Sequence, residues 1–194
     1  MTRTVFNESN TGHITKTYPI FFGDSLGLVD KVNVVNKEIE MRKEKQREGR
    51  WYPTEISLSQ DKQDMDTAPK EIVDIMNLAI SWQHTTDSVA GRSIGAMLLP
   101  HVTNSEAEGM IGEWSCIEFI HGEAYAHIVK QTRMNPDQAL VDTYKNIRVL
   151  SRSKKIIEVF NALYNLNHDL PLREKKKIMA KTLVTIMAME CISF

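Results

Sequence analysis

The chain is 194 residues long, with 24 basic and 25 acidic residues and a formal net charge of −1. This length suits one domain with an extension, and the balanced charge excludes the basic surface that nucleic-acid-binding proteins carry. We therefore expect no nucleic-acid partner. No apolar run approaches the roughly 20 residues that a membrane span needs, so we also expect no membrane partner. Nine glycines, six prolines and few alternating patterns favour an all-α fold.

Two further features indicate a cytoplasmic protein. Residues 1–16 are polar and lack the apolar core of a signal peptide. The only cysteines, Cys116 and Cys191, lie far apart within helical patterns. This spacing suits small buried hydrophobic residues in a reducing compartment better than a disulfide or a metal site.

Residues 1–66 are predicted to form an arm, a first helix and a connector. The arm covers about residues 1–24, and a charged helical pattern follows over about 30–47. Residues 49–55 break this helix and contain Trp51, and a tryptophan in such a loop is usually a packing anchor. Residues 57–66 are predicted to be a polar connector.

Residues 67–194 are predicted to form a partial helical bundle. Its expected helices cover, in chain order, residues 69–98 and 104–133, two patterns within 137–167, and residues 171–194. Pro69 suits the start of the first of these helices, with Thr67 as its cap. The sequence from Thr103 to Glu106 has the form of a capping box at the start of the next.

Three of these helices each carry a carboxylate on an apolar face: Asp87, Glu118 and Glu190. Burying unpaired carboxylates is costly, and three in one core would repel one another strongly unless cations lay between them. His121 follows Glu118 by three residues, the spacing that aims both side chains at one ion in a helical bundle. Carboxylate oxygens combined with imidazole suit iron or manganese.

Each of these residues also has a simpler interpretation when it is taken alone. A Glu-x-x-His pair occurs by chance on helix surfaces, and Asp87 could instead pair with Arg92. Glu190 has the weakest alternative, because its predicted face, which includes Ile186 and Met187, is almost entirely apolar. Gly91, inside a predicted helix, costs about 1 kcal/mol relative to alanine, which suggests close approach of another helix.

At this point the sequence resembles the small, radical-generating subunit of class I ribonucleotide reductase. Five stretches carry the resemblance, in the family's order and at similar separations: Pro19–Gly23, Trp51–Glu55, Asp87–Ser93, Glu118–Ile128 and Glu190–Phe194. The resemblance implies a ferritin-like helical bundle. It also implies a ribonucleoside-diphosphate reductase, in which a separate large subunit uses the radical to reduce ribonucleotides to deoxyribonucleotides for DNA synthesis.

The resemblance implies a set of metal ligands. Asp87, Glu118 and His121 match ligands of a first ion, and Glu190 matches a ligand of a second, with Glu118 bridging the two. The implied cofactor is a pair of iron ions in a di-iron-oxo centre, with manganese as an alternative.

The resemblance also implies roles for three aromatic residues. Tyr125 matches the tyrosine that is oxidised to a stable radical when the reduced di-iron centre reacts with oxygen. Trp51 matches the tryptophan that passes an electron to the site during assembly. Phe194 matches an aromatic residue that lines the dry surroundings of the radical. The spacing is consistent with a role for Tyr125 at the metal site, because Tyr125 lies one helical turn past His121 on the same face of the predicted helix.

The sequence departs from the family in its ligand count. The family has four carboxylate and two histidine ligands, and the second Glu-x-x-His does not occur in these 194 residues, nor does the tail that docks on the large subunit. The stretch Thr182–Phe194 also lacks the cap residues that usually end a helix. We therefore expect a bundle that is incomplete at its C-terminus and inactive alone. Its expected partners are a segment carrying the second Glu-x-x-His, the large subunit, and a second copy in a homodimer.

Two other interpretations remain at this stage. A different ferritin-like di-metal oxidase would share the ligands but would have no need for Tyr125. A metal-free helical interaction module would carry the same carboxylates protonated or paired with arginine, and the metal content of the purified protein would distinguish it from the other two.

Overall fold

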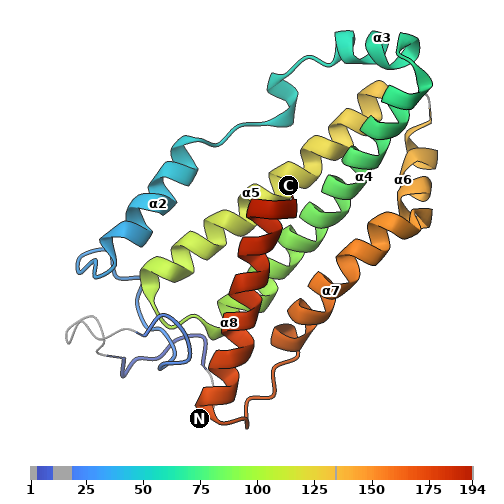
Figure 1. The fold of residues 1–194 in the computed structure, drawn as a ribbon. Helices are drawn as coiled ribbons and strands as arrows, with labels where there is room; N and C mark the ends of the chain where they lie inside the picture. The colour runs from blue at the N-terminus through green and yellow to red at the C-terminus, as the bar shows by residue number, and fades with distance from the viewer. Residues whose placement is uncertain (1–3, 11–18, 134, 194) are drawn as a thin grey trace.

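A computed structural model describes residues 4–10, 19–133 and 135–193, and Figure 1 shows its fold. Its described residues form helices, with one isolated bridge between Phe21 and Val102, so the predicted all-α class is confirmed. The longer helices are α2 (Lys37–Glu48), α3 (Ser59–Thr67), α4 (Lys70–Ser93), α5 (Ser105–Thr132), α6 (Pro136–Lys145), α7 (Ile147–Tyr164) and α8 (Leu172–Ala188). The short ones are the 3-10 turns Pro53–Glu55 and Leu99–His101 and the π-helical turns Ile94–Leu98 and Met189–Ser193.

The long helices α4 and α5 lie side by side and form the centre of the bundle (Figure 1). Helix α2 packs against α5, α7 packs against α4, and α8 packs against α7. The segment before α4, which is called the arm from here on, therefore contacts α5, the helix predicted to carry Glu118 and His121. None of the described helices has both the length and the apolar character that crossing a membrane requires.

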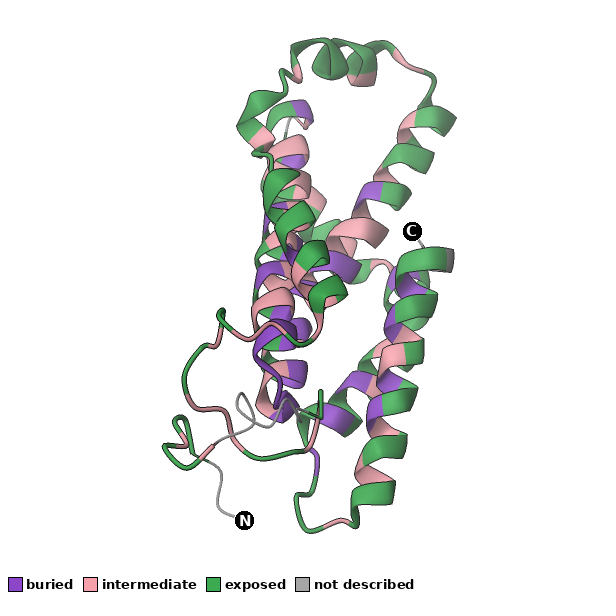
Figure 2. Cartoon of the chain, turned by 90° about the vertical axis from the view of Figure 1, so that its left-hand side faces the viewer, coloured by how far each residue is buried: buried purple, intermediate pink, exposed green. Residues whose placement is uncertain are grey.

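The hydrophobic core lies toward one end of the bundle (Figure 2). It is built from the end of α4, the turns that follow it, the start of α5, the end of α7 and the inner face of α8; its most completely buried members are Ala90, Ile94, Met97, Leu98, Leu163 and Met189. The start of α4 is different, because Ile72 and Ile75 remain 51% and 64% exposed there. Burial is therefore greatest around the end of α4, where that helix packs against α5 and α7.

The polar stretch 57–66 was predicted to be a connector, and this prediction is wrong, because α3 occupies Ser59–Thr67. Helix α3 buries none of its residues, so it has no apolar face for a periodic pattern to reveal. The cap predicted at Thr67 is also absent. The Thr67 hydroxyl donates instead to the carbonyl oxygen of Gln63 within α3 (2.9 Å), and α4 begins after Pro69 without a side-chain cap.

Helix α5 is capped by a residue that the capping-box pattern did not predict. The Asn104 side chain accepts a hydrogen bond from the Ala107 amide (2.9 Å). Glu106, buried at 1% exposure, accepts instead from the Val35 amide and from the Asn104 side chain, both at 2.7 Å. Glu106, predicted as the glutamate of the capping box, thus links the arm to the start of α5.

The two cysteines were predicted to be buried, and this prediction is wrong. Cys116 and Cys191 are both exposed free thiols. Cys116 lies two residues before Glu118, which places it about 200° around the helix from that residue. It therefore lies on the side of α5 away from the carboxylate.

Gly91 lies at a close approach of α4 and α5, as its position inside a helix suggested. A β-carbon added at Gly91 would lie 3.4 Å from the Glu118 β-carbon and from the Phe119 nitrogen. The Ser115 hydroxyl also donates to the Gly91 carbonyl oxygen across the same contact (3.1 Å). The absence of a side chain at Gly91 lets Asp87 and Glu118 face each other.

We predict that Gly91→Leu lowers the free energy of unfolding by roughly 1–3 kcal/mol, because the side chain must push α4 away from α5. The control is Gly112→Leu on α5, where an added β-carbon meets nothing within 4 Å. This control should be neutral or raise stability by up to about 1 kcal/mol through helix propensity. Urea denaturation of both variants measures the difference, and equal effects at the two positions would contradict the close contact.

Candidate metal centre

Three of the four predicted metal ligands converge between α4 and α5. Asp87 from α4 and Glu118 and His121 from α5 each offer a ligand atom, and these atoms all lie within 4.8 Å of one another. Asp87 and Glu118 are each only 4% exposed, while His121 is half-buried. The arrangement depends on the i,i+3 spacing on α5 and on the close approach at Gly91.

Glu118 is held in place by neighbours one turn before it and one turn after it. The Trp114 indole N–H donates to Glu118 Oε1 (2.7 Å), and His121 Nδ1 lies 3.2 Å from Glu118 Oε2. Trp114 was not among the predicted site residues. Its i,i+4 spacing to a buried carboxylate was the signal that could have identified the hydrogen bond.

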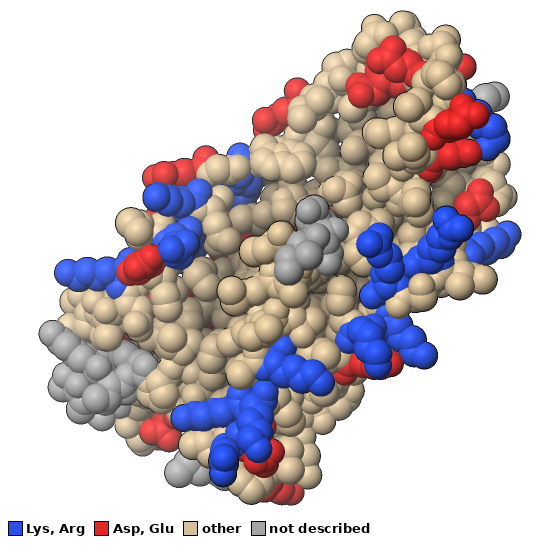
Figure 3. Space-filling model, in the orientation of Figure 1, with Lys and Arg blue, Asp and Glu red and all other residues tan. Residues whose placement is uncertain are grey.

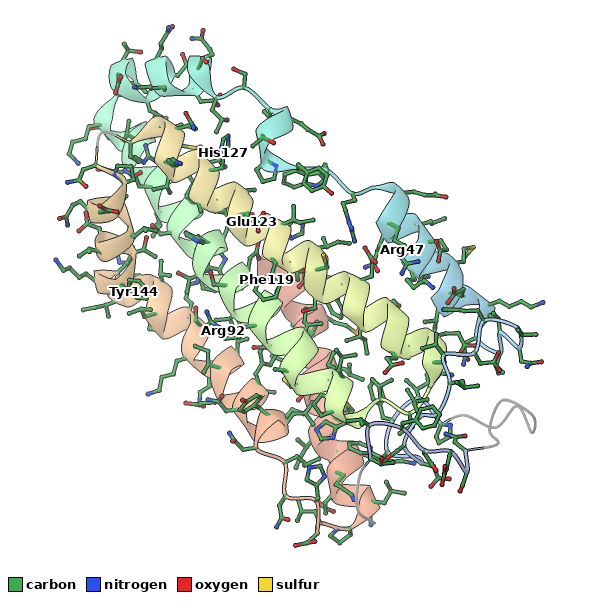
Figure 4. The ribbon with its side chains drawn as sticks, turned by 180° about the vertical axis from the view of Figure 1, so that it is seen from behind. Arg47, Arg92, Phe119, Glu123, His127 and Tyr144 are labelled. Carbon is green, nitrogen blue, oxygen red and sulfur yellow. The ribbon has the colours of Figure 1, made fainter. Side chains whose placement is uncertain are left out.

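The electrostatics of this cluster show a deficit of positive charge. Burial, and then the neighbouring charge of Glu118, raise the pKa of Asp87 to about 6. A hydrogen bond to Glu118, together with the nearby carboxylates, raises the pKa of His121. In the described part of the chain, the salt bridges of Asp87 and Glu118 go to His121 alone. Arg92, labelled in Figure 4, is exposed, so the alternative pairing with Asp87 is not observed.

This donor set fits a divalent metal ion. Buried carboxylates that face each other need a compensating cation or a shared proton, and the raised pKa of Asp87 reports that need. Two oxygen donors and one imidazole nitrogen are the ligand types that iron and manganese accept. Asp87, Glu118 and His121 are therefore the residues of this chain best placed to hold an ion.

Glu190, the fourth predicted ligand, lies near this cluster but outside the group of converging atoms. It sits in the π-helical turn Met189–Ser193, where it is partly exposed to solvent, and Met189 beside it is buried at 1% exposure. Partial burial, followed by the charges of Glu118 and Asp87, nevertheless raises the pKa of Glu190 to about 7. Glu190 is thus within electrostatic range of the site, and its role as a ligand stays a prediction.

Tyr125 lies beside the cluster, where it interacts electrostatically with Asp87. Burial raises the pKa of Tyr125 to about 12, with a further contribution from the negative charge of Asp87. The ring of His84, on α4, lies 6.3 Å from the Tyr125 ring between centroids. Sequence analysis did not identify His84, because its spacing matches no ligand pattern.

Trp51 also reaches this site, although it is distant in sequence. Its ring stacks on His121, with centroids 6.2 Å apart and planes inclined by 28°. Trp51 remains 36% exposed. Phe194, the remaining predicted site residue, lies outside the described residues.

The family model described as "Ribonucleotide reductase, small chain" matches residues 32–194. The ribonucleoside-diphosphate reductase subunit beta of Buchnera aphidicola subsp. Baizongia pistaciae is 29% identical, over 100% of this chain and 56% of its own length. The chain thus spans little more than half the length of that relative.

Two solved structures share the fold. The ribonucleotide reductase R2 subunit from Clostridium botulinum has a TM-score of 0.84 and 16% identity, over 98% of this chain and 57% of that protein. The dimanganese(II) form of NrdF from Streptococcus sanguinis has a TM-score of 0.57 and 18% identity, over 72% of this chain and 49% of that one. The likeness confirms the predicted ferritin-like bundle.

We predict that the metal-free chain loses stability as pH rises from about 5 to about 8. The pKa values of Asp87, about 6, and Glu190, about 7, lie above their ordinary values in the folded state. The folded state therefore holds more protons than the unfolded state in this range, and the free energy of unfolding falls as those protons leave. The raised pKa of His121 acts in the same direction, since its favourable charge is lost with rising pH.

The measurement is urea denaturation at both pH values for the unmodified chain and for Asp87→Asn. The variant should show a pH dependence smaller by about 2 kcal/mol, because it has no carboxylate to ionise at this position. A divalent ion such as Mn²⁺ should restore the stability of the unmodified chain at the higher pH. Stability that rises with pH in the metal-free chain would contradict the electrostatic assignment.

Proposed function

This chain belongs to the ribonucleotide reductase small-chain family, and we propose that it carries the radical-generating site of that enzyme's small subunit. The family suggested by the sequence motifs is thereby confirmed. In the proposed function, a large subunit uses the radical to reduce ribonucleoside diphosphates to deoxyribonucleotides. One observation carries this proposal: the buried cluster of Asp87, Glu118 and His121 lies beside Tyr125, and the charge of Asp87 helps to raise the pKa of that phenol.

The proposed cofactor is a pair of iron ions, with manganese as the alternative. Asp87, Glu118 and His121 would hold one ion, and Glu190 would bind the second with Glu118 shared between them. When bound, the metal ions supply the reaction with oxygen that removes one electron from a nearby tyrosine. Manganese is kept open by the structural neighbour from Streptococcus sanguinis, which is a dimanganese(II) protein. We propose that the remaining ligands, a carboxylate and a histidine, come from a segment outside these 194 residues.

Tyr125 is the proposed radical residue. Its pKa of about 12 keeps the phenol protonated at neutral pH, and the neighbouring Asp87 carboxylate would accept the phenolic proton when the ring is oxidised. Tyr125 is also half-buried, which limits the access of water and reductants to the ring. We propose that Phe194 contributes to the same shielding.

Trp51 is the proposed electron donor during assembly. Its ring stacks on His121, so an electron from the indole crosses a single ring-to-ring contact to reach a metal ligand. The 36% exposure of Trp51 leaves part of the residue open to a reductant in solution.

The proposed small subunit also pairs with a second copy and with the large subunit, as in the family that it belongs to.

We predict that the chain alone binds about one divalent ion per molecule tightly and forms no lasting radical. The reason is that Glu190 is exposed and that the second ion needs further ligands. The test loads the purified chain with ferrous iron, admits oxygen, and measures iron per chain and the electron paramagnetic resonance signal. Asp87→Asn should remove most of the bound metal. Two tightly held irons and a stable tyrosyl signal would show that the chain is complete by itself, whereas no metal uptake would favour a metal-free helical module.

We predict that Tyr125→Phe abolishes the tyrosyl signal in a site completed by a segment carrying Glu-x-x-His, and that it leaves metal binding within about twofold, because the phenol is not a ligand. The matched control is Tyr164→Phe, since Tyr164 is 63% exposed on α7. Paramagnetic resonance after exposure to oxygen measures the radical, and metal analysis measures the occupancy. A normal radical yield in Tyr125→Phe would exclude the assignment. Normal metal oxidation without a radical in the unmodified protein would favour another ferritin-like oxidase.

A further inference from the structure

A buried carboxylate on α5 joins the arm to the helix that carries the metal centre. Glu113 is only 8% exposed, and it accepts a hydrogen bond from Arg47 Nε (2.9 Å) and a second from the Arg50 guanidinium. Burial alone would raise its pKa, but the two arginines lower the pKa of Glu113, so it stays ionised. Figure 4 shows Arg47 on α2, the helix that packs against α5.

The two arginines occupy different places in the arm. Arg47 is in the last turn of α2, whereas Arg50 lies in the loop after Gly49, where its amide donates to the Arg47 carbonyl oxygen (3.2 Å). Arg50 immediately precedes Trp51. The ion pair with Glu113 therefore fixes the backbone directly before the tryptophan.

A second anchor fixes the backbone directly after Trp51. The Tyr52 amide donates to the Glu55 carboxylate (3.2 Å), and the Glu55 amide donates to the Tyr52 carbonyl oxygen (3.0 Å). This capped turn, Pro53–Glu55, packs against α5. Trp51 is therefore held between two fastened points.

Glu113 and His121 are eight residues apart on α5, which is about 12 Å along the helix axis. One end of this stretch binds Arg50, and the other end meets the ring of Trp51. One helix, α5, thus positions both Glu113, to which the loop is attached, and the His121 ring, on which Trp51 stacks. This differs from the attachment at Glu106, which accepts from Val35 and holds a part of the arm before α2.

We propose that Glu113, through Arg50, is a positioning residue that holds the Trp51 ring against His121. The role of Trp51 in electron transfer rests on the proposed function, but the positioning itself does not, because it is a property of the metal-free chain. Without the Glu113 carboxylate, the loop loses the side-chain attachment to α5 that directly precedes Trp51, and the indole leaves the face of His121 for solvent. Arg47 contributes less to the position of Trp51, because it lies on α2, before the loop.

The test labels the chain with 5-fluorotryptophan and follows the ¹⁹F resonances of Trp51, Trp82 and Trp114 without metal. Single Trp→Phe variants assign the three signals. In Glu113→Gln and in Arg50→Ala, the H₂O/D₂O isotope shift of the Trp51 signal should rise from a value typical of 36% exposure toward that of the urea-unfolded chain. The Trp82 signal, on α4, should not move. Arg50→Lys, which keeps the charge, should restore most of the Trp51 position.

Two controls separate positioning from general loosening of the arm. Arg47→Ala should move the Trp51 signal less than Arg50→Ala does. Glu106→Gln should lower the midpoint of urea unfolding without moving the Trp51 signal. An unchanged Trp51 signal in both Glu113→Gln and Arg50→Ala would overturn the proposal, and so would an equal change in Glu106→Gln. Arg50 is partly exposed, so Arg50→Ala remains informative even if Glu113→Gln folds poorly.

A second measurement separates this proposal from the role assigned to Trp51. In the completed, iron-loaded protein, Arg50→Ala should slow radical assembly in the same direction as Trp51→Phe, and the double variant should be no slower than Trp51→Phe alone. If Trp51 leaves His121 in the metal-free chain and assembly is unaffected, the positioning role stands and the electron-transfer role fails. Additive slowing in the double variant would show that Arg50 acts by another route and would overturn the proposed path through Trp51.

Discussion

The structure is organised around two carboxylates that are buried face to face. Asp87 and Glu118 are each 4% exposed, and the positive partner that the described residues offer them is one half-buried histidine. Such a pair lowers the stability of a metal-free bundle at neutral pH, since one member must give up charge or stay poorly compensated. A bound cation reverses the sign of this interaction. The least favourable feature of the metal-free fold is thus also the source of its affinity for metal.

The backbone is arranged to bring these carboxylates together. Gly91 has no side chain at the point where α4 packs against Glu118, so the two helices can approach closely there. The Ser115 hydroxyl donates a hydrogen bond to the Gly91 carbonyl oxygen across the same contact. Trp114 then holds one oxygen of Glu118 and leaves the other beside His121. Each of these residues acts on the position of a ligand and binds no metal itself, and together they keep the donor atoms in place before an ion arrives.

The sequence predicted those parts of the fold and site that depend on helical spacing alone. The existence of α4 and α5, and the meeting of Asp87, Glu118 and His121, follow from apolar periodicity interrupted by charge, although α4 ends at Ser93, before the predicted residue 98. Features set by tertiary contacts could not be predicted in this way. Helix α3 has no buried face, the Asn104 cap replaced an equally plausible box, and Cys116 faces away from the core. The Arg50–Glu113 pair joins residues 63 positions apart, and no local pattern reports such a pair.

Glu190 shows where periodicity and packing diverge. The predicted face placed it with Ile186 and Met187, but the buried stripe of α8 runs through Thr182, Ile186 and Met189, and Met187 is 64% exposed. The π-helical turn that begins at Met189 changes the helical register at this point, so Glu190 flanks the buried stripe. If Glu190 is a ligand, the face that carries it must first be covered by a further element. Covering that face and binding the second ion then stabilise each other. The ion neutralises the carboxylate that the covering element would otherwise bury unpaired, and the covering element excludes the water that would otherwise compete for the ion.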